Sequence, residues 1–391
     1  NFSRKRINSF HRNSMTENLS IIGGGIAGLM LGCVAKINGR HCKIYEKSES
    51  LSVHGAGISL SPNTTKIFEE IGILENLLEE SCMPIDVVWR KSDGEIIKKI
   101  EMKKMGQVLT TNRHTLVKIL YNRFISLGGE IVFSHELREI SENKITFENE
   151  ASVISDTIIG ADGIKSLIRT KYFISDLPKF SGYTAWRGIG SSDSKRINIY
   201  LGKNSHIVCY PINKKLETSF VGILRNNKIN SDSWREEGTK EELLSDLSEY
   251  GDFIHQLLKS SQKVYRWGIY DRPTLNSYSK NNIILIGDSA HPMMPFLGQG
   301  GSMAIEDSYI LGNLIAKINN IDKVKMYFDQ LRVKRANGIK KSSKVQGYLN
   351  HINSPVLQKV RNYLLDRTNI AMRRTQTVSY THLRAHETLR Y

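Results

Sequence analysis

Three glycine-rich segments hold the residues of this chain that are best suited to bind a nucleotide cofactor. In the first, residues 23–28 read GGGIAG, so that Gly23, Gly25 and Gly28 match the spacing G-x-G-x-x-G. Gly23 permits a tight turn, Gly25 lets a pyrophosphate approach the backbone, and Gly28 lets a helix pack closely on a strand. The N-terminus of that helix offers free N–H groups and the positive end of its dipole to phosphates. The segment therefore predicts a dinucleotide site.

The elements around this segment are those that a dinucleotide site needs. A β-rich run, 19–22, precedes it, and apolar residues with helical spacing follow it through residue 37. A second β-rich run, 42–45, ends at Glu46, 18 residues after the last glycine of the motif. A carboxylate at that place can accept hydrogen bonds from a ribose diol. Strand, helix and acid together make the motif specific, although it does not distinguish FAD from NAD.

Two further segments place an acid beside a glycine after a β-rich run. Residues 160–166 read GADGIKS, and residues 282–292 read NIILIGDSAHP. The second segment continues into a glycine-rich loop at 295–301 and a helix predicted over 302–318. Acids in such turns can bind a cofactor, but Asp162 in the first segment could instead cap the next helix.

Other side chains that suggest chemistry lack the partners that this chemistry would need. Ser289 has no G-x-S-x-G flanks and no traceable triad, so we do not interpret it as a nucleophile. His291 has no second metal ligand at a usable spacing, which favours a helix-entry or packing role, and no metal site is expected. Four cysteines show neither paired nor metal-ligand spacing, and we interpret them as reduced thiols of a cytoplasmic protein.

In their order and distances, the three segments resemble the glycine fingerprint, the DG motif and the GD motif of the single-component flavoprotein aromatic hydroxylases, the family related to para-hydroxybenzoate hydroxylase. The resemblance covers nearly all of residues 15–318. Residues 55–63 and 112–116 fit the family as well, whereas 181–188 and 267–272 look like its salicylate, 3-hydroxybenzoate and urate hydroxylase branches. Three independent motifs make this resemblance specific.

The resemblance implies a set of residues that bind FAD. Asp288 would bind the ribityl chain, and the loop at 295–300 would approach the isoalloxazine and the pyrophosphate. Asp162 and Gly163 would help to bind both the flavin and the nicotinamide cofactor, and Leu137 would contact the adenine region through its backbone. The implied FAD-binding residues are Gly23, Gly25, Ile26, Ala27, Gly28, Glu46, Lys47, Ser59, Arg113, Leu137, Asp162, Gly163, Asp288, Pro295, Gly298, Gln299, Gly300 and Gly301.

The same resemblance implies the reaction. The family consumes NAD(P)H, which binds transiently without a Rossmann domain of its own, and O2, which reacts with reduced flavin to give a C4a-hydroperoxide. The distal oxygen attacks an electron-rich ring, usually a phenolate or similar anion, while the protein supplies positioning, a dry cavity and substrate deprotonation. We therefore expect an FAD-dependent, NAD(P)H-consuming monooxygenase that hydroxylates a small aromatic or heteroaromatic substrate.

Candidates for the substrate site lie on predicted sheet strands. His206 and Tyr210 are four residues apart, hence on one face, and either could hydrogen-bond a substrate or take its proton. Arg187 could bind a carboxylate or support the interface between domains. As we align them, urate hydroxylases have an arginine near position 206, and this departure counts against urate. Further candidates are Cys209, Thr218 and Phe220, although strand alternation alone does not show which face of the sheet they occupy.

The elements together predict an α/β fold, in which a Rossmann-like FAD-binding domain is interleaved with a β-sheet substrate domain and followed by a C-terminal helical segment. The substrate domain is expected to contain strands 198–201, 207–210 and 218–224, a helix over 240–259, and a hairpin of 83–90 and 95–100. The predicted domain boundaries are 15–82, 111–176 and 276–320 for the FAD-binding domain, 83–110 and 177–275 for the substrate domain, and 321–377 for the C-terminal helices.

The two ends are expected to lie outside the natural protein. Residues 1–14 lack an initiator Met, and we interpret this segment as an untranslated leader. The alternative that it is a genuine basic arm stays open. Residues 378–391 include a string that looks like one reading frame of a transposon-based sequencing adapter, and the natural C-terminus is expected to be missing. The leader carries +4 and the tail +1 of the formal charge of +16, which leaves +11 scattered among polar residues. We therefore do not expect nucleic acid as a partner, and, because no apolar run approaches the length of a membrane span, we expect no stable membrane insertion.

Other functions share these motifs. A monooxygenase of the same fold could act on a tetracycline-like polyketide or an alkene, and a reductase that saturates isoprenoid chains would consume no oxygen. A non-catalytic redox sensor would bind FAD without substrate-stimulated turnover. The complete GD loop favours an enzyme.

Overall fold

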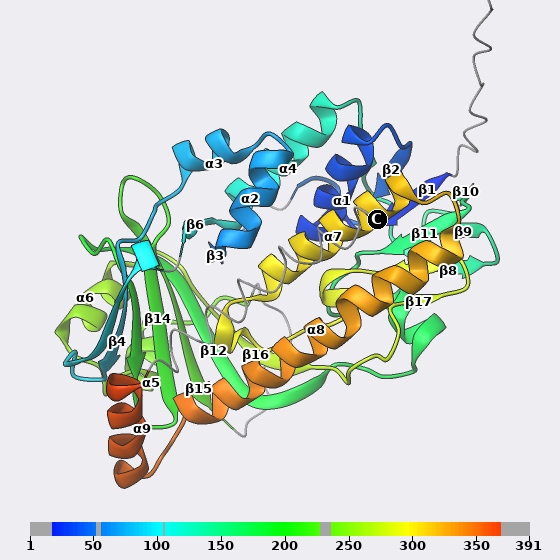
Figure 1. The fold of residues 1–391 in the computed structure, drawn as a ribbon. Coiled ribbons are helices and arrows are strands. Elements are labelled where there is room, and N and C mark those ends of the chain that lie inside the picture. The colour runs from blue at the N-terminus through cyan, green and yellow to red at the C-terminus, as the bar shows by residue number, and fades with distance from the viewer. Residues whose placement is uncertain (1–17, 52–55, 105, 227–235, 369–391) are drawn as a thin grey trace, which may run out of the picture.

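The computed structural model describes residues 18–51, 56–104, 106–226 and 236–368. Figure 1 shows two lobes, one built around a parallel sheet with helices and one around a larger sheet, with a long helix running past both. The architecture is the predicted mixed α/β fold with helices at its C-terminal end.

The first lobe is built on a six-stranded sheet. In sheet order its strands are β17 (Ser279–Lys280), β18 (Ile283–Leu285), β11 (Thr157–Gly160), β1 (Leu19–Ile22), β2 (Cys42–Tyr45) and β7 (Glu130–Val132). All neighbours pair in parallel except β17, which is antiparallel at one edge. The central strands are rich in isoleucine and fully buried, as expected for a parallel sheet with both faces covered.

Helices cover this sheet and extend the lobe. They are α1 (Ile26–Ile37), α2 (Pro62–Glu70), α3 (Leu74–Glu80), α4 (Arg113–Ser126) and α7 (Gly300–Lys317). The helix α1 packs against α4 and α7, and its apolar side chains share one buried core with the strands. Smaller ladders complete the lobe, a pair of β3 (Gly57–Leu60) with β6 (Leu109–Asn112) and an antiparallel sheet of β8 (Leu137–Ser141), β9 (Lys144–Phe147) and β10 (Ser152–Ile154).

The second lobe is built on a seven-stranded sheet. In sheet order its strands are β16 (Val264–Asp271), β12 (Lys179–Ser191), β15 (Glu217–Arg225), β14 (Ser205–Pro211), β13 (Ile197–Leu201), β4 (Asp86–Lys91) and β5 (Ile96–Glu101). As the sequence predicts, the early hairpin of β4 and β5 joins the sheet made by the later strands, through a parallel pairing of β4 with β13. The domain boundaries proposed above remain predictions.

One predicted helix is wrong. Residues 240–259 form two helices, α5 (Lys240–Asp246) and α6 (Asp252–Ser260), where the apolar spacing predicts one. Gly251 has an extended backbone and is the N-cap residue of α6, so a new helix begins after it. The break leaves no sign in the apolar spacing, because Tyr250 between the helices is buried in the same cluster as the apolar residues of both.

Two helices end the described chain. The helix α8 (Ile321–Asn350) packs along α7 and then against the turn at Pro295–Leu297, and its end lies at the second sheet (Figure 1). The helix α9 (Pro355–Arg367) packs on β5. Across the described ranges, none of the helices combines the length and apolarity needed to cross a bilayer.

Candidate active site

The turn between β1 and α1 is shaped by close backbone packing. Gly23 has a φ of +113°, its N–H donates to the Tyr45 carbonyl at 2.8 Å, and an added Cβ would lie 2.4 Å from the Ala161 carbonyl oxygen. An added Cβ at Gly28 would lie 2.0 Å from the Gly23 carbonyl oxygen. At Gly25, by contrast, an added Cβ would meet none of the described atoms within 4 Å. Gly23 and Gly28 therefore close the turn, whereas Gly25 leaves its backbone open to a ligand.

Glu46 follows β2 and lies beside the same turn. Its Oε2 accepts a hydrogen bond from the Gly24 N–H at 2.7 Å, and its Oε1 accepts one from the Ser48 N–H at 2.9 Å. The turn thus fixes the direction of the carboxylate, whose remaining lone pairs can accept from a diol. Lys47, predicted beside it, has an exposed side chain.

The DG segment follows β11 at the same edge of the sheet. The Oδ2 of Asp162 accepts from the N–H of Ile168, the residue before the short helical turn Arg169–Phe173, at 3.3 Å. Its Oδ1 is buried and has no hydrogen-bond partner among the described residues. Burial raises the pKa of this carboxyl, although hydrogen bonds from Ser166 and Ile168 act in the opposite direction. Gly163 has a φ of +77°, which turns the chain away from the sheet.

The GD segment after β18 is bound by a buried ionic cluster of side chains from α7 and α8. The Oδ2 of Asp307 accepts from the Gly287 N–H at 2.9 Å and lies 2.5 Å from Nε2 of His291, and its Oδ1 accepts from Arg332 at 2.6 Å. The sequence favours a helix-entry or packing role for His291, and the structure shows it buried and bound to Asp307. The Ser289 hydroxyl lies 2.6 Å from the Gly160 carbonyl oxygen and 2.7 Å from that of Ile286, so its single proton is shared between two acceptors of the turn, and we do not interpret it as a nucleophile.

Asp288 projects from this rigid segment, and its side chain is exposed although both neighbours are buried. An added Cβ at Gly300 would lie 3.9 Å from its Oδ1, which puts the carboxylate at the N-terminus of α7. Gly298, with a φ of +63°, ends the turn that begins at Pro295. An added Cβ at Gly301 would lie 2.6 Å from Cδ1 of Ile58, so β3 meets α7 at the same place.

The other predicted cofactor residues lie at varied depths. Gln299 caps α7, and its Oε1 is buried without a partner in the part of the chain that the structure describes. Ser59 lies on β3, and Arg113 opens α4 with an exposed side chain. The Leu137 side chain is buried in the core, so only its backbone can meet a cofactor. An open glycine backbone and two helix N-termini fit the phosphates of a dinucleotide, and the two unpartnered buried oxygens can accept from its hydroxyl or N–H groups.

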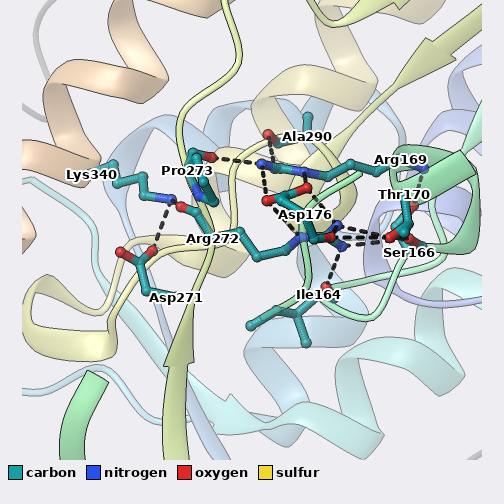
Figure 2. Close-up of polar contacts among 10 residues, drawn as sticks. All are labelled: Ile164, Ser166, Arg169, Thr170, Asp176, Asp271, Arg272, Pro273, Ala290 and Lys340. Atoms are coloured by element: carbon teal, nitrogen blue, oxygen red, sulfur yellow. Dashed lines mark hydrogen bonds and ion pairs between the residues drawn. The ribbon is translucent and has the colours of Figure 1, made fainter. Parts of the chain in front are cut away.

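A buried cluster joins the motifs of the first lobe to the second sheet (Figure 2). Arg169 donates to the carbonyls of Ala290 at 3.0 Å and Pro273 at 2.6 Å, so it ties the GD segment to the end of β16. Arg272 donates to the Ile164 carbonyl of the DG segment at 3.0 Å. Both side chains are fully buried, and both form ion pairs with Asp176, at 3.2 and 2.8 Å.

Sequence reasoning did not single out Asp176 or the link that it makes. Burial would raise the pKa of the Asp176 carboxyl, but hydrogen bonds from Arg272 and Arg169 outweigh this and leave the pKa below its ordinary value. Nearby, Lys340 of α8 pairs with Asp271 at 2.8 Å. The one sequence signal for this link was the pair Asp271-Arg272 before a proline, because two adjacent opposite charges at a strand end need separate partners.

The second sheet has a helix-covered face and a face toward the first lobe. Cys209 and Phe220 are buried in the cluster that the sheet forms with α5 and α6. The hypothesis that they line the substrate site is therefore wrong, because alternation turns them away from the cofactor segments. Thr218 has the parity of Phe220, and its hydroxyl pairs with Ser192 at 2.9 Å.

His206 and Tyr210 lie on the opposite face of β14, toward the cofactor segments. The His206 ring centroid is 5.8 Å from that of Phe296, in the turn before Gly298. An added Cβ at Gly57 of β3 would lie 2.8 Å from a ring carbon of Tyr210. Burial raises the pKa of the Tyr210 hydroxyl and lowers that of the His206 imidazole, so the first stays a donor and the second stays neutral.

Arg187 shares this face on β12. Its guanidinium carbon lies 5.1 Å from the ring centroid of Tyr265 and 5.2 Å from that of Trp267, two residues of the neighbouring strand β16. Burial, with repulsion from Arg113, lowers the pKa of Arg187 to about 10. A buried guanidinium with a second arginine nearby forms a region of positive potential, which suits an anionic group.

Comparison with known proteins agrees with this geometry. The family model of the FAD binding domain matches residues 15–338. The 3-amino-4-hydroxybenzoate 2-monooxygenase PtnB3 of Streptomyces platensis is 26% identical over 373 residues, which are 90% of this chain and 93% of that protein. Salicylate hydroxylase of Pseudomonas putida is 25% identical over 386 residues, with 88% of each chain covered. Klebsiella pneumoniae HpxO complexed with FAD and uric acid has the same fold, with a TM-score of 0.82 at 19% identity, and 93% of this chain and 96% of that chain are covered.

The fold, the glycine turn and the two acidic segments define a flavoprotein of the single-component hydroxylase class. The chain belongs to the FAD binding domain family. It is an FAD-dependent monooxygenase of the aromatic hydroxylase type, and the resemblance found in its motifs is confirmed.

Proposed function

We propose that the enzyme hydroxylates a small aromatic or heteroaromatic ring that carries an ionisable hydroxyl and an anionic group, with NAD(P)H and O2 as co-substrates. The observation that carries this proposal is the shared face of Arg187, His206 and Tyr210, which puts a cation, a neutral base and a hydroxyl donor opposite the cofactor segments. Relatives named for a hydroxybenzoate and for salicylate act on rings of this kind. With four free thiols, a cytoplasmic location belongs to the same proposal.

Each of these side chains has a proposed task. Arg187 would bind the anionic group, and its two aromatic neighbours hold the guanidinium in place. His206 would take the proton of the ring hydroxyl, while Tyr210 would donate a hydrogen bond to the resulting oxyanion. Phe296 and the buried sheet face would keep water away from this oxygen.

The cofactor would be held by the segments described above. Glu46 would bind a ribose, the open backbone at Gly25 and the N-terminus of α1 would meet the pyrophosphate, and Asp288 would bind the ribityl chain. Bound FAD supplies the exchange of electrons with NAD(P)H and the activation of O2. The chain's own residues position the ring and control its proton.

The function is tested on the purified protein with FAD. NADH and NADPH oxidation and oxygen uptake would be followed across hydroxybenzoates, hydroxypyridines, purines, tetracyclines and alkenes. Stimulation by a hydroxylated aromatic acid, with a product that gains one oxygen atom, is the expected result. Stimulation only by a polyketide or an alkene would contradict the substrate class, and flavin binding without any stimulation would instead favour a redox sensor.

Replacement of His206 by glutamine is expected to lower kcat by about 100-fold at neutral pH, which is the ordinary size of a general-base contribution. The loss should shrink as the pH rises toward the pKa of the substrate hydroxyl, because the ring then ionises without help. The measurement is a pH profile of kcat for the best substrate of the panel. A profile that keeps its shape and height in H206Q would remove His206 from the proposed mechanism.

A further inference from the structure

His206 has a buried partner from a distant part of the chain. Its Nδ1 lies 3.1 Å from Nε2 of His351, the residue that follows α8. The two ring centroids are 4.8 Å apart, and both side chains are almost fully buried. No interpretation of the sequence joined these residues, which are 145 positions apart.

The surroundings of His351 restrict where its protons can be. Its Nδ1 lies 2.7 Å from the Gly347 carbonyl oxygen, and its Nε2 lies 3.2 Å from the Ile223 carbonyl oxygen. Both carbonyl oxygens can only accept, and a neutral imidazole carries a single N–H, so the shorter contact assigns that proton to Nδ1 of His351. In a neutral His351 the Nε2 then has a lone pair, which can accept the Nδ1–H of His206.

We propose that His351 is a positioning residue for deprotonation of the substrate: it fixes His206 as the Nδ1–H tautomer and then accepts the proton displaced from that nitrogen. The inference rests on the proposed role of His206. In this tautomer, Nε2 of His206 is the unprotonated nitrogen on the far side of the ring from His351. That nitrogen is therefore the one left to meet the substrate hydroxyl.

The proton balance of the step is simple. The O–H bond of the substrate breaks as an N–H bond forms at Nε2 of His206, and the substrate keeps the electron pair as an oxyanion. The Nδ1–H bond of His206 breaks as an N–H bond forms at Nε2 of His351. The Ile223 carbonyl, 3.2 Å away, can then accept from this new N–H. His351 becomes an imidazolium whose two N–H groups both face a carbonyl oxygen.

The residues around the pair favour the neutral starting state. Burial lowers the pKa of both imidazoles, and positive charge on Arg361 of α9 acts in the same direction on each. At His351 the hydrogen bonds to the Gly347 and Ile223 carbonyls oppose the effect of burial and Arg225 of β15 adds to it, and the pKa stays below its ordinary value. The Tyr183 ring of β12 packs 4.8 Å from the His351 ring, and burial raises the pKa of its hydroxyl. Both histidines are thus uncharged before substrate binds, as a base and a proton acceptor must be.

Close packing at the end of α8 explains why His351 lies beside His206. Phe296 lies between the helix and the sheet, with its ring centroid 5.5 Å from His351 and 5.8 Å from His206. An added Cβ at Gly347 would lie 2.4 Å from a ring carbon of Phe296. A glycine one turn before His351 therefore lets the helix approach the cofactor loop closely, and the same glycine supplies the carbonyl that fixes the His351 tautomer.

The tautomer is tested first, without any turnover. In the FAD-bound enzyme labelled with [15N]histidine, the nitrogen signals of His206, assigned by their absence from H206Q, are expected to show a proton on Nδ1 and none on Nε2. In H351F, which keeps an aromatic ring but no acceptor, the proton is expected to move to Nε2. A wild-type His206 with its proton on Nε2 would overturn the proposal.

The proton transfer is tested with 4-nitrophenol, whose phenolate has its own visible absorbance, bound to the same holoenzyme. H206Q and H351Q are both expected to raise the apparent pKa of the bound phenol by about one unit or more, a tenfold change in ionisation. Glutamine at 351 can still accept a hydrogen bond but cannot hold a proton, so a merely structural role would leave this pKa unchanged. His255→Gln, on α6 across the sheet, is the matched control and is expected to have no effect.

The two variants separate the inference from the proposed function. A shift in H206Q alone would overturn the role of His351 and keep His206 as the base. A shift in neither would contradict the role of His206 itself, and the inference would fall with it. A shift in both, with H255Q unchanged, is the result that supports the pair.

Discussion

Replacement of Asp176 by alanine is expected to lower the free energy of unfolding by about 3–5 kcal/mol, the usual cost of removing one partner from a buried ion pair. The carboxylate is 8% exposed and is the shared partner of two arginines that are 0% exposed. Without it, Arg169 and Arg272 keep their charges in the interior, with carbonyl oxygens and the Thr170 hydroxyl as the remaining acceptors. Chemical unfolding, followed by flavin fluorescence and by circular dichroism, measures the loss.

A surface ion pair provides the comparison. Lys43 and Glu130 lie 2.9 Å apart but are 52% and 56% exposed, so Glu130→Ala is expected to change stability by less than about 1 kcal/mol. If Asp176→Ala were no more destabilising than Glu130→Ala, the buried cluster would not join the two lobes energetically. Should the alanine variant fail to fold, Asp176→Asn keeps the shape and removes only the charge.

The same carboxylate predicts how stability depends on pH. Its folded-state pKa lies below the ordinary value of 3.8, so the unfolded chain binds the proton more readily. The stabilisation is therefore fully present above pH about 4 and is lost as the pH falls through the folded-state pKa. Acid unfolding of Asp176→Asn should consequently begin from a lower stability and lose less between pH 5 and 3 than the wild type does.

The sequence was informative wherever function depends on residues close together in the chain. The glycine turn, Glu46 and the two acidic segments each have their partners within one strand and one helix, so their spacing alone predicts their geometry. Strand alternation likewise put His206 and Tyr210 on one face. It could not say which face, because both faces of the second sheet are buried, one under α5 and α6 and one toward the first lobe.

The contacts that the sequence did not predict are those made by isolated residues over long distances. His351 reaches His206 only because α8 runs past α7 to the second sheet, and no local pattern gives the length or direction of that path. Asp176 lies in an irregular segment and meets Arg272 across 96 positions. The broken helix at Gly251 was missed for another reason, since burial of Tyr250 continues the apolar spacing through a turn.

Gly28→Ala is expected to weaken FAD binding through a steric clash at the turn between β1 and α1. The added Cβ would lie 2.0 Å from the Gly23 carbonyl oxygen and 3.2 Å from Cγ2 of Ile21, both fixed parts of β1 and its turn. Relief requires α1 to move away from the strand, which costs about 1–3 kcal/mol by overpacking alone and weakens FAD binding by about tenfold to 100-fold through loss of the helix N-terminus. Flavin retained after gel filtration, with a titration of the apoprotein, measures the effect.

Two other glycines separate packing from ligand binding at this turn. An alanine Cβ at Gly25 would meet no described atom of the protein within 4 Å, so Gly25→Ala is expected to keep the stability of the apoprotein while weakening FAD binding. Gly338 is exposed within α8, and an added Cβ there would likewise meet no described atom within 4 Å. The Gly338→Ala variant should therefore bind FAD normally and be more stable by about 0.5–1 kcal/mol. If Gly25→Ala bound FAD as tightly as Gly338→Ala, the open backbone at Gly25 would not be where the pyrophosphate lies. Because the protein itself leaves that space free, only a ligand can account for a loss of affinity there, and the comparison therefore locates the cofactor without requiring turnover.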